Sequence, residues 1–418
     1  MNADEEAGKA RAQGSGADAP TSALSGLIVA DFSRVLAGPL ATMMLGDLGA
    51  TVIKVEEPER GDDSRAWGPP YVDGESTYYL STNRNKRSVT LNLKSDEGRA
   101  LFFRLLETAD IFVDGFAGDA CDALGIGYEA QRAVKPDIIY AQCSGFGAHG
   151  SLSRLPTHGM MMGSLGGGAR LRVNEEGLAE ELGGLTDGTM VGATATALTA
   201  VSALVRRART GAGCYVDGAG SDAVLATEWF RPTYYWNADR IVDRSGMFDP
   251  SGRNPKYSYY VTKDDKYVMF CAIEPKFWRN FCVGADREDL LDVHDAGVAV
   301  DYSSGGDALV YALRDLFRTR TQQEWTDLAV AHDVPLGPAN QVEDLRDYAH
   351  LRDRGIVHDS EHPVAGSFTS VGWPALVSGQ RFDITRHAPA VGEHTSEVLS
   401  ELGVSEIDLA ELGSRHII

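Results

Sequence analysis

The sequence has few basic residues and no long apolar run. Asp and Glu number 60 against 39 Lys and Arg, which gives a formal net charge of −21 at pH 7. Binding of nucleic acid needs clusters of Lys and Arg that neutralise phosphates, so this balance argues against such a partner. No uninterrupted apolar stretch approaches the roughly 20 residues of a membrane helix, so no membrane partner is expected. A small anionic ligand is still compatible with the charge, because a few local Arg and Lys residues suffice for a basic pocket.

Cysteine is also scarce, and no Cys-x-x-Cys pair occurs. The five cysteines are scattered along the chain: Cys121, Cys143, Cys214, Cys271 and Cys282. This usage is typical of reduced thiols in the cytoplasm, and it predicts neither a disulfide framework nor a zinc site. His149, His158 and His294 lack the spacing of metal ligands, so no metal is expected. Residues 1–22 lack the apolar segment of a secretory signal and are predicted to be a disordered leader.

What the sequence does contain is a regular alternation of apolar runs and amphipathic stretches. The runs GLIVADF, ATVIKVE, RSVTLNL, DIFVDGF and DIIYAQC predict parallel strands, and GRALFFRLLETA predicts one of the helices between them. This order predicts an α/β fold with a large, Rossmann-like, doubly wound domain over residues 23–231. Residues 232–350 are predicted to form a smaller α+β domain, with a hairpin that turns at Asp264 and Asp265. Residues 351–418 are expected to return to the large domain.

The first strand is followed by DFSRVLAGP, without the G-x-G-x-x-G turn that approaches a dinucleotide's pyrophosphate. A nicotinamide or flavin dinucleotide is therefore not expected. The sequence also lacks a G-x-x-x-x-G-K-[ST] phosphate loop and a G-x-S-x-G nucleophile elbow.

Asp187 stands in ELGGLTDGTMVGATATAL, directly before a long Ala-rich helix. One interpretation is a helix N-cap, since Asp is a preferred residue at that position. The other is a functional carboxylate, because backbone N–H groups and the helix dipole favour negative charge there. Such an Asp stays ionised and can act as a nucleophile, with the same N–H groups stabilising an oxyanion beside it. The residues alone leave both interpretations open.

Segments spread over most of the chain resemble, in order, the class III (CaiB/BaiF-type) CoA-transferase superfamily, which also includes the α-methylacyl-CoA racemases. They are GLIVADFSRVLAGPLATMMLGDLGATVIKVEEPERGDDSRAW, NRNKRSVTLNLKSDEGR, ADIFVDGFAGDACDALGIGYE, AQCSGFGAHG, the Asp187 segment, RTGAGCYVDGAGSDA, AIEPKFW and VGEHTSEVLSELG. The resemblance implies an interlocked homodimer, in which each chain threads through a ring formed by the other. It also implies a coenzyme A thioester as substrate and no covalently bound cofactor.

By this resemblance Asp187 is the catalytic aspartate. The positions that match coenzyme A contacts in relatives are Arg34, Val35, Ala37, Leu91, Gly115 and Phe116. Two positions depart from the family pattern. Ala123 stands where several relatives have a phosphate-binding Arg, and Leu36 stands where formyl-CoA transferase has a Gln near the acyl group. The second departure makes a formyl or oxalyl substrate less expected.

Two reactions of the superfamily use this aspartate differently. In the transferases it attacks an acyl-CoA thioester, forms a mixed anhydride, and then carries CoA as an aspartyl thioester that an incoming carboxylate takes over. In the racemases an Asp and a His exchange the α-proton through an enolate. His158 and Glu274 match that His and the Glu that orients it, but Gly159 and the following methionines replace the Asp-x-Asn-Tyr of the racemases.

We therefore predict a class III CoA-transferase that moves CoA from an acyl-CoA to a carboxylic acid through Asp187. The alternative is a 2-methylacyl-CoA racemase or epimerase that uses His158 and Asp187. A further alternative is a non-catalytic acyl-CoA-binding relative. The glycine-rich residues 163–168 are either a flexible cover of the acyl site, or a simple surface loop or helix-packing stretch.

Overall fold

The computed structural model describes residues 22–183, 186–240, 254–294, 297–302, 304–375, 377 and 382–418. These residues form two compact units. The first combines the residues up to Thr233 with those from Gly355 onward, and the second is Tyr234–Arg354. The predicted leader, apart from Ser22, lies outside the described residues.

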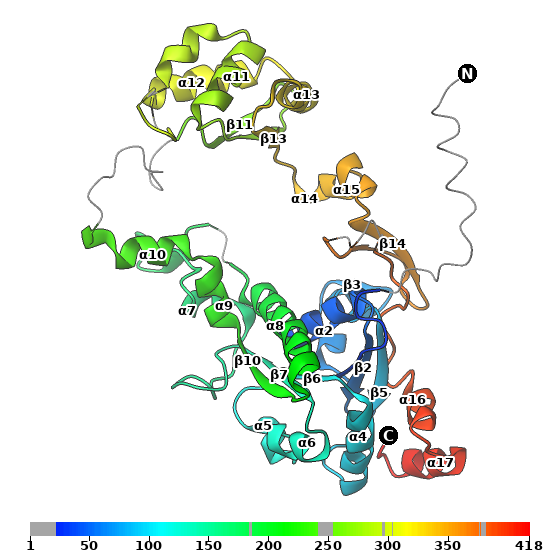
Figure 1. The fold of residues 1–418 in the computed structure, drawn as a ribbon. Coiled ribbons are helices and arrows are strands. Elements are labelled where there is room, and N and C mark those ends of the chain that lie inside the picture. Colours follow the sequence, from blue (N-terminus) through cyan, green and yellow to red (C-terminus); the bar gives the residue numbers. More distant parts are fainter. Residues whose placement is uncertain are drawn as a thin grey trace, which may run out of the picture. The chain divides into compact units, whose positions relative to one another are not determined.

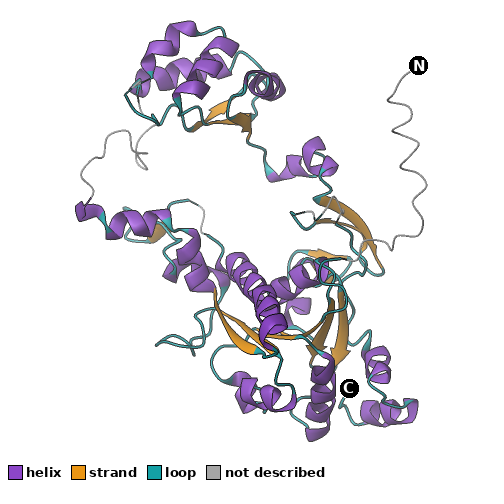
Figure 2. Ribbon diagram, in the orientation of Figure 1, coloured by secondary structure: helices purple, strands orange, loops and turns teal. Residues whose placement is uncertain are grey.

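A six-stranded parallel sheet forms the centre of the first unit (Figures 1 and 2). Its strands, in the order of the chain, are β1 (Ile28–Phe32), β2 (Thr51–Glu56), β5 (Lys86–Thr90), β6 (Ile111–Asp114), β7 (Ile139–Ser144) and β10 (Cys214–Ala219). In space the order is β10-β7-β6-β1-β2-β5, and every pairing is parallel. The chain thus starts at a central strand, builds outward through β2 and β5, and returns to build the other side. This confirms the predicted α/β fold with a parallel sheet.

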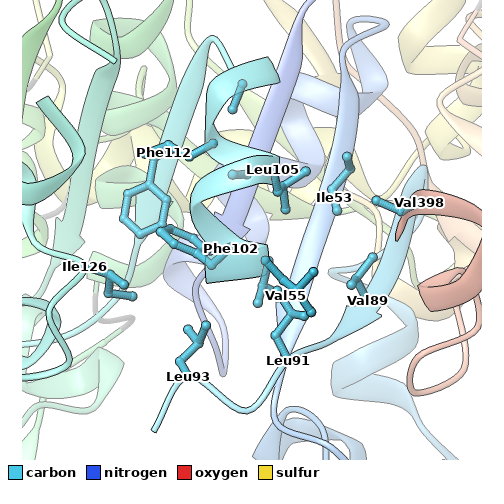
Figure 3. Packing of buried hydrophobic residues seen from close by; sticks show 14 of the residues in the cluster. Ile53, Val55, Val89, Leu91, Leu93, Phe102, Leu105, Phe112, Ile126 and Val398 are labelled. Carbon is cyan, nitrogen blue, oxygen red and sulfur yellow. The ribbon is translucent and has the colours of Figure 1, made fainter. Parts of the chain in front are cut away.

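Helices cover both faces of this sheet, because successive residues of each strand point to opposite faces and both sets are apolar. On one face, Val29 packs with α2 (Ala37–Asp47) and α8 (Gly188–Thr210). On the other face, Ala30 packs with α4 (Asp96–Thr108) and with α16 (Thr395–Glu401) and α17 (Glu406–Ser414) of the returning segment. Figure 3 shows Phe102 and Leu105 of α4 over the strand residues of this second layer.

Helix α8 is long and apolar enough, by length and composition alone, to cross a membrane. Threonines and a serine interrupt its apolar residues, so the sequence shows no continuous apolar run there. A core helix passes the same test, so one such helix is weak evidence for a membrane. Here four alanines of α8 are buried with residues of α2 and the sheet: Ala193, Ala197, Ala200 and Ala203. One face of α8 is therefore part of the core of the first unit.

The other elements of the first unit are short. They are η1 (Asp63–Ala66), β3 (Tyr71–Val72), β4 (Glu75–Ser76), α3 (Thr77–Leu80), α5 (Ala120–Ala123), α6 (Tyr128–Val134), α7 (Gly159–Leu165), β8 (Leu171–Val173), β9 (Ala179–Glu181), α9 (Gly220–Thr227), β14 (Val357–His362) and β15 (Gly366–Val371). Helix α10 (Phe230–Trp236) runs from the first unit into the second, and η2 (Ala238–Arg240) follows it.

The second unit has an antiparallel sheet covered by helices. Its elements are β11 (Ser258–Val261), β12 (Tyr267–Phe270), α11 (Pro275–Gly284), η3 (Glu288–Val293), α12 (Gly306–Phe317), α13 (Gln322–His332), β13 (Leu336–Pro338), α14 (Val342–Leu345) and α15 (Ala349–Asp353). Strands β11 and β12 form the predicted hairpin, in which Asp265 takes a positive φ of 56°. The core of the second unit is aromatic: Phe281 stacks on Phe317, and both rings lie close to Trp325.

Asp114 is a buried carboxyl at the end of β6. Its Oδ1 accepts a hydrogen bond from the N–H of Phe116 at 2.9 Å. Burial raises the pKa of Asp114 to about 6, although contacts with Tyr140 and the Phe116 N–H partly oppose this rise. The unfolded chain ionises this carboxyl more easily than the folded chain does. The free energy of unfolding therefore falls as the pH rises from about 4 to about 6.

We expect Asp114→Asn to raise the free energy of unfolding at pH 7, by up to about 3 kcal/mol for a shift of about two pKa units. The amide oxygen still accepts the Phe116 N–H, and no charge remains buried. The gain should disappear near pH 4, where the wild-type carboxyl is protonated. Urea unfolding followed by circular dichroism at several pH values measures this dependence. An equal gain at pH 4 and pH 7 would contradict the assignment.

Candidate active site

A cleft of about 290 Å³ opens at the carboxyl ends of the central strands. In open α/β sheets, ligands bind beyond these ends, at the point where the strand order reverses. That point lies between β1 and β6 in this sheet. The cleft is lined there by Phe32 and Arg34 at the end of β1 and by Phe116 after β6. The fold therefore provides a ligand position without a glycine-rich turn.

Among the predicted coenzyme A contacts, Arg34, Leu91 and Phe116 line this cleft together. The guanidinium carbon of Arg34 lies 4.8 Å from the centre of the Phe116 ring, a cation–π arrangement. The other three predicted contacts lie within three residues of these in the chain: Val35 follows Arg34, Ala37 begins α2, and Gly115 precedes Phe116. All six stay predictions as ligand contacts.

Two cationic residues of the cleft, Arg60 and Lys94, were not singled out from the sequence. Lys94 is 79% exposed and lies 3.3 Å from Glu57, while Arg60 lies 3.0 Å from Asp63. Exposed ion pairs contribute little free energy, so a ligand's anionic groups can replace these carboxylates. Both cations stand in segments that carry the family resemblance, EPERGDDSR and LNLKSDEGR, and that was the available signal.

Three buried ion pairs adjoin the cleft. They are Lys54–Asp62 at 2.8 Å, Arg65–Glu56 at 2.7 Å and Lys86–Asp31 at 3.0 Å. Burial opposes the charge on Asp62, but the attraction of Lys54 outweighs it and lowers the pKa of Asp62 to about 2. Burial also lowers the pKa of Lys86 to about 8, against the attraction of Asp31. The pairs combine three cations with three anions, so no net charge is buried.

Asp187 is the N-cap residue of α8. Its Oδ1 accepts a hydrogen bond from the N–H of Thr189 at 2.8 Å. The side chain is exposed in the single chain, and Oδ2 has no hydrogen-bond partner among the described residues. The carboxylate thus caps the helix with one oxygen and leaves the other open. The two interpretations of Asp187 are therefore compatible.

Helix α7 begins against this carboxylate. A Cβ placed on Gly159 would lie 2.4 Å from Oγ1 of Thr189 and 3.5 Å from Oδ1 of Asp187. His158 directly precedes Gly159 and is the exposed N-cap residue of α7. The structure therefore places Gly159, the residue after His158, next to Asp187. Glu274 is the N-cap residue of α11 in the second unit, and its predicted role beside His158 stays a prediction.

The glycine-rich residues 163–168 belong to the end of α7 and the turn after it. A Cβ on Gly166 would lie 2.5 Å from the carbonyl oxygen of Ser221 in α9, and one on Gly168 would lie 3.1 Å from the carbonyl oxygen of Gly163. The missing side chains therefore allow close packing, in agreement with the helix-packing alternative.

Comparison with known proteins identifies the family. Residues 24–395 match CoA-transferase family III. The chain belongs to this family. The predicted family is thus confirmed, and the enzyme class is that of the class III CoA-transferases.

Named relatives of this CoA-transferase family III member are similar over most of their length. The chain is 32% identical to human succinyl-CoA:glutarate CoA-transferase, over 91% of this chain and 86% of the relative. It is 33% identical to succinyl-CoA:mesaconate CoA-transferase of Haloarcula hispanica, over 91% and 97%. It is 30% identical to formyl-CoA:oxalate CoA-transferase of Rhodopseudomonas palustris, over 94% and 96%.

Solved structures show the same fold. The crystal structure of Rv3272 from Mycobacterium tuberculosis matches with a TM-score of 0.74 and 26% identity, over 90% of this chain and 99% of that one. A CAIB/BAIF family protein from Brucella suis matches with a TM-score of 0.72 and 28% identity, over 91% and 100%.

The contact between Gly159 and the Asp187 cap generates a prediction. In Gly159→Ala, the new methyl group must displace Thr189 or the start of α7, and it disturbs the N–H that holds Oδ1 of Asp187. Small misplacements of reacting groups are costly, so with Asp187 in its predicted catalytic role we expect kcat for CoA transfer to fall about tenfold to a hundredfold. The matched control is Gly413→Ala in α17, where a Cβ meets no atom within 4 Å. Unchanged kcat in Gly159→Ala, with the control also unchanged, would show that this contact does not matter.

Proposed function

We propose that this protein transfers coenzyme A from succinyl-CoA to a short dicarboxylic acid, with Asp187 as the nucleophile. The observation that carries the proposal is the Asp187 carboxylate, which has one oxygen bound by the Thr189 N–H and the other open. The relatives reported above are named for succinyl-CoA with glutarate or mesaconate, and for formyl-CoA with oxalate. All of these acceptors are dicarboxylates, which is the basis for the proposed acceptor class.

In the proposed reaction, Oδ2 of Asp187 attacks the thioester carbonyl of succinyl-CoA and expels the CoA thiolate. The thiolate then attacks Cγ of the resulting mixed anhydride, which releases succinate and leaves CoA on Asp187 as a thioester. The acceptor carboxylate attacks Cγ, expels the thiolate and forms a second anhydride. Attack of the thiolate on the acceptor's acyl carbon gives the new acyl-CoA and restores Asp187.

The backbone N–H of Thr189 has a defined role in these proposed reaction steps. Each attack on Cγ places negative charge on the oxygen that does not bridge to the acyl group. Since Oδ1 is held at 2.8 Å by the Thr189 N–H, Oδ1 is the oxygen that takes this charge. The N–H at the start of α8 thus stabilises the oxyanion, while the other oxygen position bonds to the acyl groups: Oδ2 leaves with succinate, and an oxygen of the acceptor takes its place.

The cleft at the end of β1 is the proposed site of the CoA nucleotide. Arg34, Arg60 and Lys94 line it and carry the cationic groups that pair with phosphates. Phe116 adds an aromatic face beside Arg34. These residues supply local positive charge on a chain whose net charge is strongly negative.

Asp187→Asn tests the nucleophile, because the amide oxygen can still cap α8 but cannot form the anhydride. We expect kcat for transfer from succinyl-CoA to glutarate to fall about a thousandfold or more. The products are followed by mass spectrometry in deuterated water, with and without the acceptor. New CoA thioesters that form only with an acceptor support transfer. Incorporation of α-deuterium into a 2-methylacyl-CoA without an acceptor, lost in His158→Ala, supports the racemase alternative instead.

An oxygen label tests the anhydride itself. With glutarate labelled with ¹⁸O in its carboxylates, the bridging oxygen of the second anhydride stays on Asp187 after the acceptor leaves as its CoA thioester. In the next turnover, this oxygen departs with succinate. We therefore expect ¹⁸O in the released succinate. Transfer without label in succinate would rule out the aspartyl anhydride and leave CoA transfer by another route.

We also propose an interlocked homodimer. Met190, Leu198 and Val205 are spaced by about two helical turns and expose an apolar stripe on α8. Leu198 is 67% exposed, and Trp229 and Phe230 before and within α10 are exposed as well. Large exposed apolar surface is typical of protein interfaces, and a second copy of the chain is the proposed cover.

Light scattering coupled to size-exclusion chromatography should give the mass of two chains. Leu198→Glu places a charge in the stripe and should shift the mass toward one chain at low protein concentration. Asp408→Lys, which changes an exposed side chain of α17 outside the stripe, is the control and should remain a dimer. A wild-type mass of one chain at micromolar concentration would refute the dimer.

A further inference from the structure

We infer that Asp62 is a positioning residue, which holds the turn between β1 and α2 in the strained shape that presents Arg34 to the cleft. The inference rests on the proposed function, because it assumes that the cleft binds coenzyme A. The buried Lys54–Asp62 ion pair thus has a role in ligand binding, although neither side chain takes part in the proposed reaction.

The strain lies at Val35, which has a φ of 72°. In this region the Cβ of an L-residue crowds the backbone, and for a β-branched residue the conformation is a genuine outlier. Val35 stands in the short turn between Phe32, which ends β1, and Ala37, which begins α2. A glycine would adopt this backbone shape without strain. The valine therefore needs an interaction that holds it there.

Asp62 supplies that interaction. Its Oδ1 and Oδ2 lie 3.1 Å and 3.2 Å from the backbone nitrogen of Val35, whose N–H they share. The ammonium of Lys54 donates to Oδ2 of Asp62 at 2.8 Å and to the carbonyl oxygen of Ser33 at 2.9 Å. The ion pair therefore holds the backbone on both sides of Arg34, through the carbonyl of Ser33 and the N–H of Val35.

The carboxylate is itself rigidly held. The side chains of Lys54 and Asp62 are 0% and 1% exposed. Asp62 also accepts hydrogen bonds from the N–H and the hydroxyl of Ser64, at 2.9 Å and 2.8 Å. Its own N–H donates to Glu56 at 2.8 Å. A strained residue persists only where its surroundings over-determine it, and this set of bonds meets that condition.

The consequence concerns Arg34. Its side chain is exposed, lines the cleft and lies over Phe116. If Asp62 no longer held the N–H of Val35, the turn would relax toward negative φ, and Arg34 would leave its place over Phe116. The loss should therefore appear in coenzyme A affinity, while the chemistry at Asp187 stays unchanged.

The test is a rescue experiment on the full-length protein, with the Kd for coenzyme A measured by isothermal titration calorimetry. Asp62→Asn loses the charge that pairs with Lys54 and weakens the bond to Val35, so we expect the Kd to rise about tenfold or more. Adding Val35→Gly to Asp62→Asn should recover at least a third of the lost affinity, because glycine takes positive φ unaided. General destabilisation is not repaired by a turn glycine, so this rescue separates positioning from a merely structural role.

Two further variants close the test. Asp47→Asn breaks another buried ion pair, with Arg84 at 2.7 Å, outside the cleft, and its Kd for coenzyme A should equal that of the wild type. If Asp62→Asn fails to fold, Val35→Pro decides, since proline forces negative φ and lacks the N–H while the ion pair remains. Wild-type Kd in Asp62→Asn, no rescue by Val35→Gly, or wild-type Kd in a folded Val35→Pro would overturn the inference. A wild-type protein that binds no coenzyme A would instead refute the proposed function.

Discussion

Burial of balanced charge is the constraint on which this structure depends. Three cations and three anions pair around the carboxyl ends of β1 and β2 and the start of β5, and all but Arg65 are almost completely buried. Removing one partner would leave its counterpart as an unpaired buried charge, which is far more costly than the pair itself. The turns that leave these strands are therefore determined by ion pairs more than by apolar packing.

The same network reaches the returning segment of the chain. Glu56 accepts a hydrogen bond from the hydroxyl of Ser88 at 2.6 Å, and that hydroxyl accepts one from the N–H of Gly392 at 2.9 Å. Glu56 also binds Arg65 and the N–H of Asp62. One carboxylate thus joins β2, β5, the segment around η1 and the returning chain. Residues far apart in the sequence meet at the wall of the cleft for this electrostatic reason.

The sequence predicted those features that follow from periodicity. Alternating apolar runs predicted the sheet, and a carboxylate before an Ala-rich segment predicted the start of α8. Features that depend on tertiary contacts had no such signal. Val35 gives no sign of positive φ, because glycine is the usual marker of that conformation. Arg60 and Lys94 are exposed charges without a pattern of their own. For residues 163–168, glycine composition fitted either mobility or close packing, and only the contacts with α9 distinguish the two.

In the proposed complex with coenzyme A, a strongly acidic chain binds a polyanion and needs local positive charge, which residues of the cleft provide. Arg34 and Arg60 both pair with Asp63, and Lys94 pairs with Glu57. The cations therefore do not face solvent as an uncompensated patch that would attract any anion at a distance. A ligand with several phosphates can compete with these carboxylates at several points at once, whereas a single carboxylate or phosphate exchanges one weak ion pair for another. In the proposed complex, the acidic partners therefore favour the nucleotide over smaller anions, and the placement of Arg34 between Phe116 and Asp63 matters as much as its charge.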